Sequence, residues 1–302
     1  MNSSTSNSKR FFIAFTVTFV VGVFAFVLGS EMIVRTIAAP KSEFDALRAR
    51  LHSSEASYGA FADSRGANGL RPRSSFENFS MAGDNLLTIV EKAKFFARSG
   101  GVKGIIVQAD PHHFASYRLN RDQTQLRDDL FSLEYAWLQF MRPVYRQYLL
   151  EYWQALIEHS LSPPPVTRAP HAITRFSALS RAKMTTSASI RAGQQTPIET
   201  FKNTEFARAY QSAIIDLRQA EIRVCLVTFP VSSAYREISQ AEPAYTHALQ
   251  YYKTLAHDSD AAYFDFSSAF EDSLFSDPDH LNSDGAQALT DTALKNCFGI
   301  NG

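Results

Sequence analysis

Residues 58–65 read YGAFADSR, and this stretch decides the fold that the rest of the chain completes. Residues 58–62 form a short apolar run, and a polar turn follows at Asp63, Ser64 and Arg65. An apolar run that is bounded by a turn is typical of a buried strand. The stretch therefore predicts a buried strand that ends in a turn displaying a serine.

Further apolar runs follow this strand and alternate with stretches of helical apolar spacing. The expected strands cover residues 58–62, 76–81, 103–108, 222–229 and 262–266. The expected helices cover residues 85–98, 204–219, 244–256 and 283–295. This alternation predicts an α/β fold around a mostly parallel sheet of about five strands, with ligands bound beyond the carboxyl ends of the strands.

The composition excludes several classes of protein. The 302 residues contain 30 Lys and Arg against 30 Asp and Glu, so the formal net charge is zero. A dedicated nucleic-acid binder needs an excess of basic residues, and we therefore expect no nucleic-acid partner. With 45% hydrophobic residues and 24 Phe, the chain is too apolar to be disordered along most of its length.

The two cysteines, Cys225 and Cys297, exclude a disulfide-rich scaffold and any Cys-rich zinc module. A single bridge between them stays open at this point. Cys225 lies within an apolar run, where a free cysteine usually behaves as a small hydrophobic residue. The free thiol is therefore the favoured interpretation.

Residues 11–30 contain no charged side chain. Twenty helical residues at about 1.5 Å each span roughly 30 Å, the thickness of the hydrocarbon core of a bilayer. This predicts a transmembrane anchor; the alternative is a signal peptide cleaved after Ala39, but the apolar stretch is long for one and the cleavage site is poor. Because only the ten-residue tail is short enough to be a cytoplasmic stub, we expect residues from about 31 onward to lie outside the cytoplasm.

The expected organisation has four parts. They are a cytoplasmic tail at 1–10, the anchor at 11–30, a juxtamembrane linker at 31–57, and an α/β domain at 58–302 with an insertion at 117–200. Residues 130–157 of the insertion are rich in aromatic residues and predict one or two helices. These helices either pack on the main domain or present aromatic side chains to lipid headgroups or a membrane partner.

The end of the insertion is basic. Residues 166–200 carry five basic side chains and one acidic side chain, a local charge of +4 in a neutral chain. A solvated mobile loop is the favoured interpretation. The alternative is attraction to anionic lipid or to an anionic polymer.

Residues 275–285 read FSDPDHLNSDG and lie between the last expected strand and the last expected helix. Asp277 comes three residues before His280, so its carboxylate can lie beside the imidazole, fix its tautomer and stabilise the imidazolium. Such a histidine acts as general base toward a hydroxyl group. Ser64 offers that hydroxyl, because both residues follow strands whose carboxyl ends meet at one edge of a parallel sheet.

Residues 78–85, NFSMAGDN, follow the second expected strand. Gly83 can present its N–H to an acyl carbonyl without a Cβ in the way, so Gly83 and the N–H of Ser64 predict an oxyanion hole. Structural interpretations stay open as well. Ser64 suits a helix N-cap, and Asp277 and Asp279 suit a turn.

Asp110, His112 and His113 raise the question of a metal site. The side chains of neighbouring histidines at a strand exit usually diverge, and no third ligand is evident. We therefore expect neither a metal nor a cofactor.

The blocks at 62–65, 78–83 and 277–280 resemble those of the SGNH (GDSL-like) hydrolase superfamily in order, spacing and strand context. The resemblance covers roughly half of the chain and implies a flavodoxin-like three-layer fold. It implies that Ser64 is the nucleophile and Gly83 an oxyanion donor. Asp277 is then the orienting acid and His280 the base.

Two departures from the family pattern are visible. Ala62 stands where the first block has a glycine, and the third block, Gly-x-Asn-Asp, is absent because the third strand ends in Gln108. We expect Gln108 to replace the missing amide of the oxyanion hole. Arg65 and Asn85 are assigned with it to the oxyanion or binding site.

The chain is most similar to the membrane-anchored members of the superfamily that act in alginate and cellulose O-acetylation or lipoteichoic acid D-alanylation. The resemblance implies a periplasmic enzyme on a bacterial inner membrane that transfers an acyl group, expected to be acetyl, through an acyl-serine. A cell-surface polysaccharide or exopolysaccharide would be the acceptor and a membrane-bound O-acyltransferase the partner. Two alternatives stay open: an esterase with the same Ser-His-Asp triad, and a non-catalytic scaffold of a polysaccharide-modifying complex.

Overall fold

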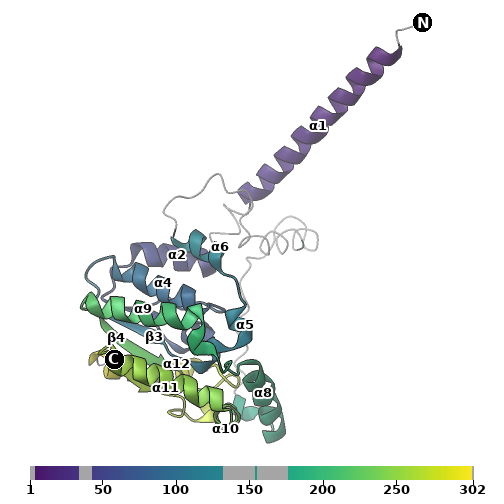
Figure 1. Cartoon of the computed structure of the whole chain (residues 1–302). Coiled ribbons are helices and arrows are strands. Elements are labelled where there is room, and N and C mark those ends of the chain that lie inside the picture. The colour runs from purple at the N-terminus through teal and green to yellow at the C-terminus, as the bar shows by residue number, and fades with distance from the viewer. Residues whose placement is uncertain (1–3, 34–42, 132–153, 155–175, 301–302) are drawn as a thin grey trace. The chain divides into compact units, whose positions relative to one another are not determined.

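The computed structural model describes residues 4–33, 43–131, 154 and 176–300. The chain divides into two units, and each is described by itself: Met1–Ala46 with Ser132–Ala169, and Leu47–Phe131 with Pro170–Gly302. The first unit contains helix α1 (Ser4–Ile33), drawn in purple in Figure 1. Over Ser8–Met32 this helix has the length and composition of a membrane span, as an anchor or a signal sequence has.

The second unit is built on five parallel strands in the order β2-β1-β3-β4-β5. The strands are β1 (Tyr58–Phe61), β2 (Phe76–Asn78), β3 (Gly104–Gln108), β4 (Arg223–Thr228) and β5 (Ala262–Asp265). In the register of the sheet, Ala60 pairs with Asn78 and Ile106, and Ile106 pairs with Cys225. This order confirms the flavodoxin-like α/β fold, whose switch point lies between β1 and β3.

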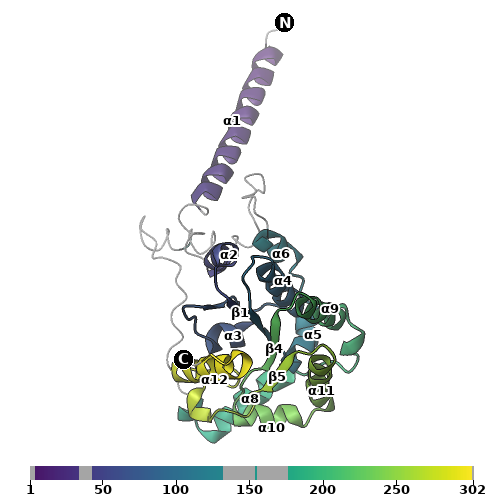
Figure 2. The same cartoon turned by 90° about the vertical axis from the view of Figure 1, so that its left-hand side faces the viewer.

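Helices cover both faces of the sheet (Figure 2). One face carries α4 (Leu86–Ala97), α9 (Glu205–Gln219) and α11 (Pro243–Asp258), and the other carries α3 (Ser64–Gly69) and α12 (Ser283–Phe298). Successive strand side chains alternate between the faces. Phe61 therefore packs on Phe96 of α4, with ring centroids 5.6 Å apart, while Ala60 joins the core beneath Leu289 of α12.

Further helices complete this part of the chain. They are α2 (Glu43–Ser53), α5 (Ser116–Leu119), α6 (Thr124–Phe131), α8 (Arg181–Gln194), α10 (Ser233–Gln240), and the 3-10 helices η3 (Pro111–Phe114), η4 (Phe176–Ala178), η5 (Phe201–Asn203) and η6 (Asp272–Leu274). Most of the helices predicted at 130–157 lies outside the described residues.

Two segments that were expected to be irregular form helices. The predicted linker at 31–57 contains α2, and His52 of α2 packs edge-on against Phe95 at 4.7 Å. The favoured loop interpretation of 166–200 is wrong where the structure describes that stretch, because α8 packs on α10. Small buried residues allow the contact: Ala188 and Ala192 lie against Tyr235.

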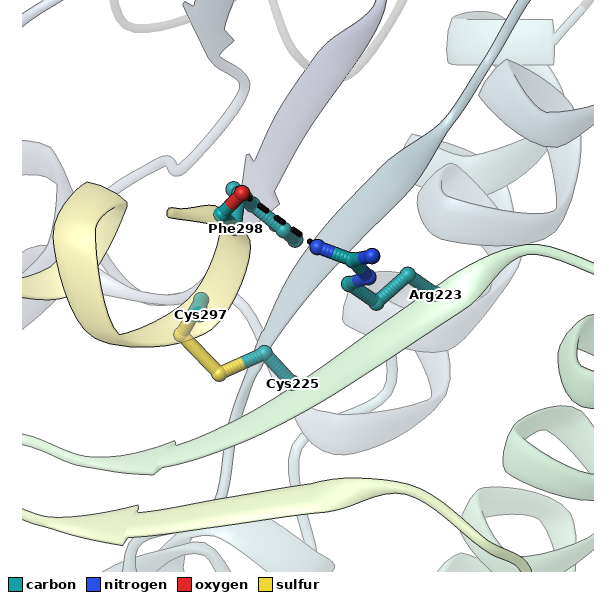
Figure 3. The surroundings of a disulfide bond; sticks show 4 residues. All are labelled: Arg223, Cys225, Cys297 and Phe298. Carbon is teal, nitrogen blue, oxygen red and sulfur yellow. Dashed lines mark hydrogen bonds between the residues drawn. A yellow bond between two sulfur atoms is a disulfide. The ribbon is translucent and has the colours of Figure 1, made fainter. Parts of the chain in front are cut away.

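Cys225 of β4 and Cys297 of α12 form a disulfide, with Cα atoms 5.7 Å apart (Figure 3). The favoured free-thiol interpretation is therefore wrong. The apolar run around Cys225 did indicate burial, but the sheet register also turns this side chain toward α12, where Cys297 is buried. Beside the bridge, Arg223 Nη1 donates a hydrogen bond to the carbonyl oxygen of Phe298 at 3.2 Å.

Candidate active site

Ser64 is the first residue of α3 and comes three residues after the end of β1. The N-cap of this helix is Asp63, whose Oδ1 accepts a hydrogen bond from the N–H of Arg65 at 3.0 Å. The capping role that the sequence left open for Ser64 therefore belongs to Asp63. The serine hydroxyl is left available for another partner.

That partner is His280. Its Nε2 lies 2.8 Å from Oγ of Ser64, and its Nδ1 lies 2.8 Å and 3.0 Å from the two carboxylate oxygens of Asp277. When Asp277 accepts the proton of Nδ1, Nε2 is left as the acceptor for the serine hydroxyl. The structure thus brings Ser64, His280 and Asp277 into one hydrogen-bonded chain.

The turn that carries His280 is organised by the same carboxylate. Oδ1 of Asp277 also accepts hydrogen bonds from the N–H of Asp279 at 3.0 Å and from the N–H of His280 at 2.9 Å. Asp277 therefore acts as the turn residue that the sequence left open, in addition to contacting the imidazole.

The surroundings of His280 favour its protonated form. Burial disfavours the imidazolium, but the hydrogen bond to Asp277 and the negative charges of Asp279 and Asp277 outweigh it and raise the pKa of His280 above its usual 6.5. An imidazolium that forms when the serine loses its proton is stabilised by the same carboxylates.

Arg65 lies below the site rather than in it. Its side chain is buried, and its Nη2 donates to Oδ2 of Asp279 at 3.2 Å and to Oε1 of Gln195 at 2.8 Å. Its Nη1 lies 3.3 Å from Oδ2 of Asp110. The expected oxyanion or binding role therefore does not fit Arg65, because the guanidinium is occupied by these buried acceptors.

Asp279 is a second carboxylate close to His280, with Oδ1 3.6 Å from Nδ1. Burial would raise the pKa of Asp279, but the positive charges of Arg65, His280 and Arg191 outweigh burial and hold it well below its usual value. Nε of Arg191 on α8 donates to both Asp279 oxygens, at 2.9 Å and 3.1 Å. The sequence does not indicate this contact, because Arg191 lies in a stretch predicted to be a loop.

The expected oxyanion role does not fit Gln108 either. Its Oε1 accepts a hydrogen bond from the N–H of Asp63 at 2.7 Å, and its Nε2 donates to Oδ1 of Asp63 at 3.1 Å and to Asp110. Both amide hydrogens are used in these buried bonds. Gln108 therefore holds the turn below Ser64 and cannot replace the missing amide.

Asn85 is the N-cap of α4. Its Oδ1 accepts a hydrogen bond from the N–H of Thr88 at 3.0 Å, and its Nδ2 donates to the carbonyl oxygen of Arg121 at 3.0 Å. Both ends of the side chain are thus engaged inside the protein. Asn85 positions neighbouring segments instead of contacting a ligand, in contrast to the expectation.

Gly83 lies in a loop that is docked against the end of β1. The N–H of Met81 donates to the carbonyl oxygen of Ala62 at 3.2 Å. Arg118 links the two segments, with Nη2 2.5 Å from Oδ2 of Asp63 and Nη1 2.9 Å from the carbonyl oxygen of Asp84. The sequence does not indicate this role for Arg118, since the residue falls in the segment predicted to be an insertion.

The histidines after β3 do not diverge as expected. The rings of His112 and His113 stack with centroids 4.5 Å apart, and with Asp63 they form a group of side chains of the kind that binds metal ions. However, Oδ2 of Asp63 already accepts hydrogen bonds from Nε2 of His112 at 2.8 Å and from Arg118. Burial, followed by the charge of Arg65, lowers the pKa of His112 to about 3. His112 is therefore a neutral histidine beside the ion pair of Asp63 and Arg118.

A cavity of about 340 Å³ lies beside His280. One wall is the turn that carries Asp277, Pro278, Asp279 and His280. The other wall is α8, through Ser187, Ile190, Arg191 and Gln194. His280 therefore lines this cavity.

No protein-family model and no curated protein matches the chain. Several solved structures are similar to it, and two of them are described here. One is a protein from Streptococcus pneumonia provisionally described as a platelet activating factor, with 12% identity and a TM-score of 0.42 over 93% of this chain and 98% of that chain. The other is an acetyl xylan esterase, with 13% identity and a TM-score of 0.40 over 79% of this chain and 98% of that chain.

Proposed function

We propose that this chain is a serine-dependent acyl-ester enzyme of the SGNH type. One observation carries the proposal: His280 lies 2.8 Å from the Ser64 hydroxyl through Nε2 and holds Asp277 through Nδ1. A hydroxyl paired with an oriented imidazole is the arrangement that activates a serine nucleophile. The cavity beside His280 supplies room for the ester.

In the first step, Oγ of Ser64 bonds to the carbonyl carbon of the acyl donor while Nε2 of His280 takes the hydroxyl proton. The electron pair of the C=O bond moves to the oxygen, which accepts hydrogen bonds from the N–H groups of Ser64 and Gly83. The bond to the leaving group then breaks, and the leaving group takes the proton from His280. An acyl-serine remains.

In the second step, a hydroxyl group of the acceptor attacks the acyl-serine and gives its proton to His280. The Ser64 ester bond breaks, and Oγ recovers the proton. We extend the proposal to a polysaccharide hydroxyl as acceptor, acetyl as the acyl group and a membrane-bound O-acyltransferase as the partner that supplies it. If water is the acceptor, the enzyme is an esterase, which is the second candidate function. Asp277 is half-exposed, so solvent lies close to the base, and this observation favours the esterase.

Two features support a location outside the cytoplasm. Helix α1 has the length and composition of a membrane anchor over Ser8–Met32. The disulfide between Cys225 and Cys297 is typical of proteins in an oxidising compartment. Both features agree with a single-pass protein of the bacterial inner membrane whose enzyme domain lies in the periplasm.

The test uses the full-length chain in detergent micelles. A fluorophosphonate should label the wild type at Ser64 and the control variant Ser53→Ala equally, and Ser64→Ala should not be labelled. With 4-nitrophenyl acetate and cellohexaose, acetylated oligosaccharide indicates transfer, whereas free acetate as the sole acyl product indicates an esterase. A wild type that is neither labelled nor active overturns the proposal and favours the non-catalytic scaffold.

A further inference from the structure

The oxyanion hole expected from the sequence has two backbone donors, the N–H groups of Ser64 and Gly83. No acceptor within the described residues takes either N–H. The side-chain amides that could have joined them, those of Gln108 and Asn85, are engaged elsewhere. Any side-chain donor near Gly83 would therefore be another residue.

Arg121 lies directly against Gly83. A Cβ at position 83 would lie 2.5 Å from Nη1 of Arg121 and 3.1 Å from its Cζ and Nη2. Gly83 also has a φ of +88°, a conformation that favours glycine. The missing side chain is therefore what allows the guanidinium to reach the loop.

The backbone of Arg121 is fastened to the same loop. Its carbonyl oxygen accepts a hydrogen bond from Asn85 Nδ2 at 3.0 Å. Two residues further on, Gln123 donates through Nε2 to the carbonyl oxygen of Gly83 at 3.0 Å and accepts the N–H of Asn85 at 2.8 Å. These bonds fix the root of the Arg121 side chain relative to Gly83.

The Gly83 loop is in turn fixed relative to Ser64. The guanidinium of Arg118 joins Asp63, the residue before Ser64, to Asp84, the residue after Gly83. The side chain of Arg121 thus belongs to an assembly that includes the turn of the proposed nucleophile.

The guanidinium of Arg121 has no acidic partner among the described residues, and its side chain is exposed. This distinguishes it from its neighbours. Arg118 pairs with Asp63 at 2.5 Å and Arg127 pairs with Glu91 at 3.3 Å. Five N–H donors of Arg121 are therefore available to a ligand at the Gly83 loop.

We infer that Arg121 is the side-chain donor of the oxyanion hole, an inference that rests on the proposed function. When Oγ of Ser64 bonds to the acyl carbon, the C=O electron pair moves to the oxygen, and Arg121 donates a charged hydrogen bond to it. Arg121 keeps its protons throughout, because His280 holds the proton from the serine. A cation there stabilises the transition state more than the neutral ester.

The experiment compares Arg121→Ala, Arg121→Lys and the control Arg98→Ala in the full-length chain in detergent. Arg98 is an exposed arginine at the far end of α4. With 4-nitrophenyl acetate, Arg121→Ala should lower kcat about 100-fold, the typical effect of removing one oxyanion donor, with little change in KM. Arg121→Lys should keep part of the activity, and added guanidinium ion should restore part of it to Arg121→Ala. Arg98→Ala should match the wild type.

Fluorophosphonate labelling of Ser64 should slow in parallel, because the phosphonyl oxygen occupies the same hole. If Arg121→Ala has wild-type kinetics and the activity still depends on Ser64, the inference is overturned and the proposed function stands. A moved pH midpoint or a lower Tm in Arg121→Lys would indicate a structural role and would also overturn it. No Ser64-dependent activity in the wild type overturns both.

Discussion

Arg65 and Asp279 form a buried ion pair in which Nη2 lies 3.2 Å from Oδ2 and both side chains are 2% exposed. Arg65 directly follows Ser64, and Asp279 directly precedes His280. The pair therefore fastens the segments that carry the proposed nucleophile and base, which lie 216 positions apart in the sequence. Because the pair is shielded from solvent, added salt weakens it little.

Arg65→Ala should destabilise the protein strongly, since it leaves Asp279 and Asp110 buried without this partner. Removing one member of a buried pair costs about 3–5 kcal/mol of unfolding free energy. Arg191→Ala is the matched control, because Arg191 is one-third exposed and Arg65 still pairs with Asp279 in that variant. Arg191→Ala should lower the unfolding free energy by only about 1 kcal/mol. Urea unfolding measures both, and equal losses would contradict the role given to Arg65.

The pH dependence of kcat/KM should follow His280. Its neutral form is the base, so kcat/KM should rise with pH through a midpoint above 6.5. Asp277→Asn removes the carboxylate charge that helps to raise the pKa of His280, so it should move the midpoint downward while lowering kcat. A flat profile from about pH 5 to 8 would exclude His280 as the base.

The raised pKa of His280 also makes a prediction for stability. Protonation is favoured in the folded state, so this contribution is complete below about pH 6.5 and is lost as the pH rises through the higher folded pKa. His280→Gln should remove that part of the pH dependence of the unfolding free energy. The unfolding free energy at pH 5.5 is compared with that at pH 8 in both proteins. If the difference is the same in His280→Gln as in the wild type, the folded protein does not raise the pKa of His280.

Ser64→Ala should abolish activity and leave stability nearly unchanged, within about 0.5 kcal/mol, because Asp63 is the cap of α3. Asp63→Ala removes the cap and leaves Arg118 buried without its carboxylate, so a loss of about 3–5 kcal/mol is expected. Urea unfolding of both variants provides the comparison. A comparable loss in Ser64→Ala would show that the serine has a structural role instead.

Replacing both cysteines, in Cys225→Ala/Cys297→Ala, should lower the unfolding free energy by about 4 kcal/mol, because the bridge closes a long loop in the unfolded chain. The bridged residues are 72 positions apart, and both are buried. Thiol labelling of the wild type should therefore require both a reductant and a denaturant. Labelling by denaturant without reductant would show that the cysteines are unpaired.

The strands at 58–62 and 103–108 could be predicted, because an apolar run bounded by turns indicates a buried strand from the local sequence alone. Ser64, Asp277 and His280 could be predicted as a group, because each follows a strand and the carboxyl ends of parallel strands meet at one edge. The hydrogen-bond partners of the other candidate site residues could not be predicted. Gln108, Asn85 and Arg65 bond to residues 45, 36 and 214 positions away, and no local pattern encodes those distances.

By itself, the sequence determined the α/β alternation, the apolar N-terminal helix and the three residues proposed to carry the chemistry. The first two follow from periodicity and length within a short window, and the three residues follow from their type and from their place after parallel strands. Only the tertiary structure decided that Cys225 meets Cys297, that α8 forms a wall of the cavity, and that Arg121 lies on Gly83. These contacts join distant segments, so they exist only once the sheet order has placed those segments side by side and buried their polar groups against one another.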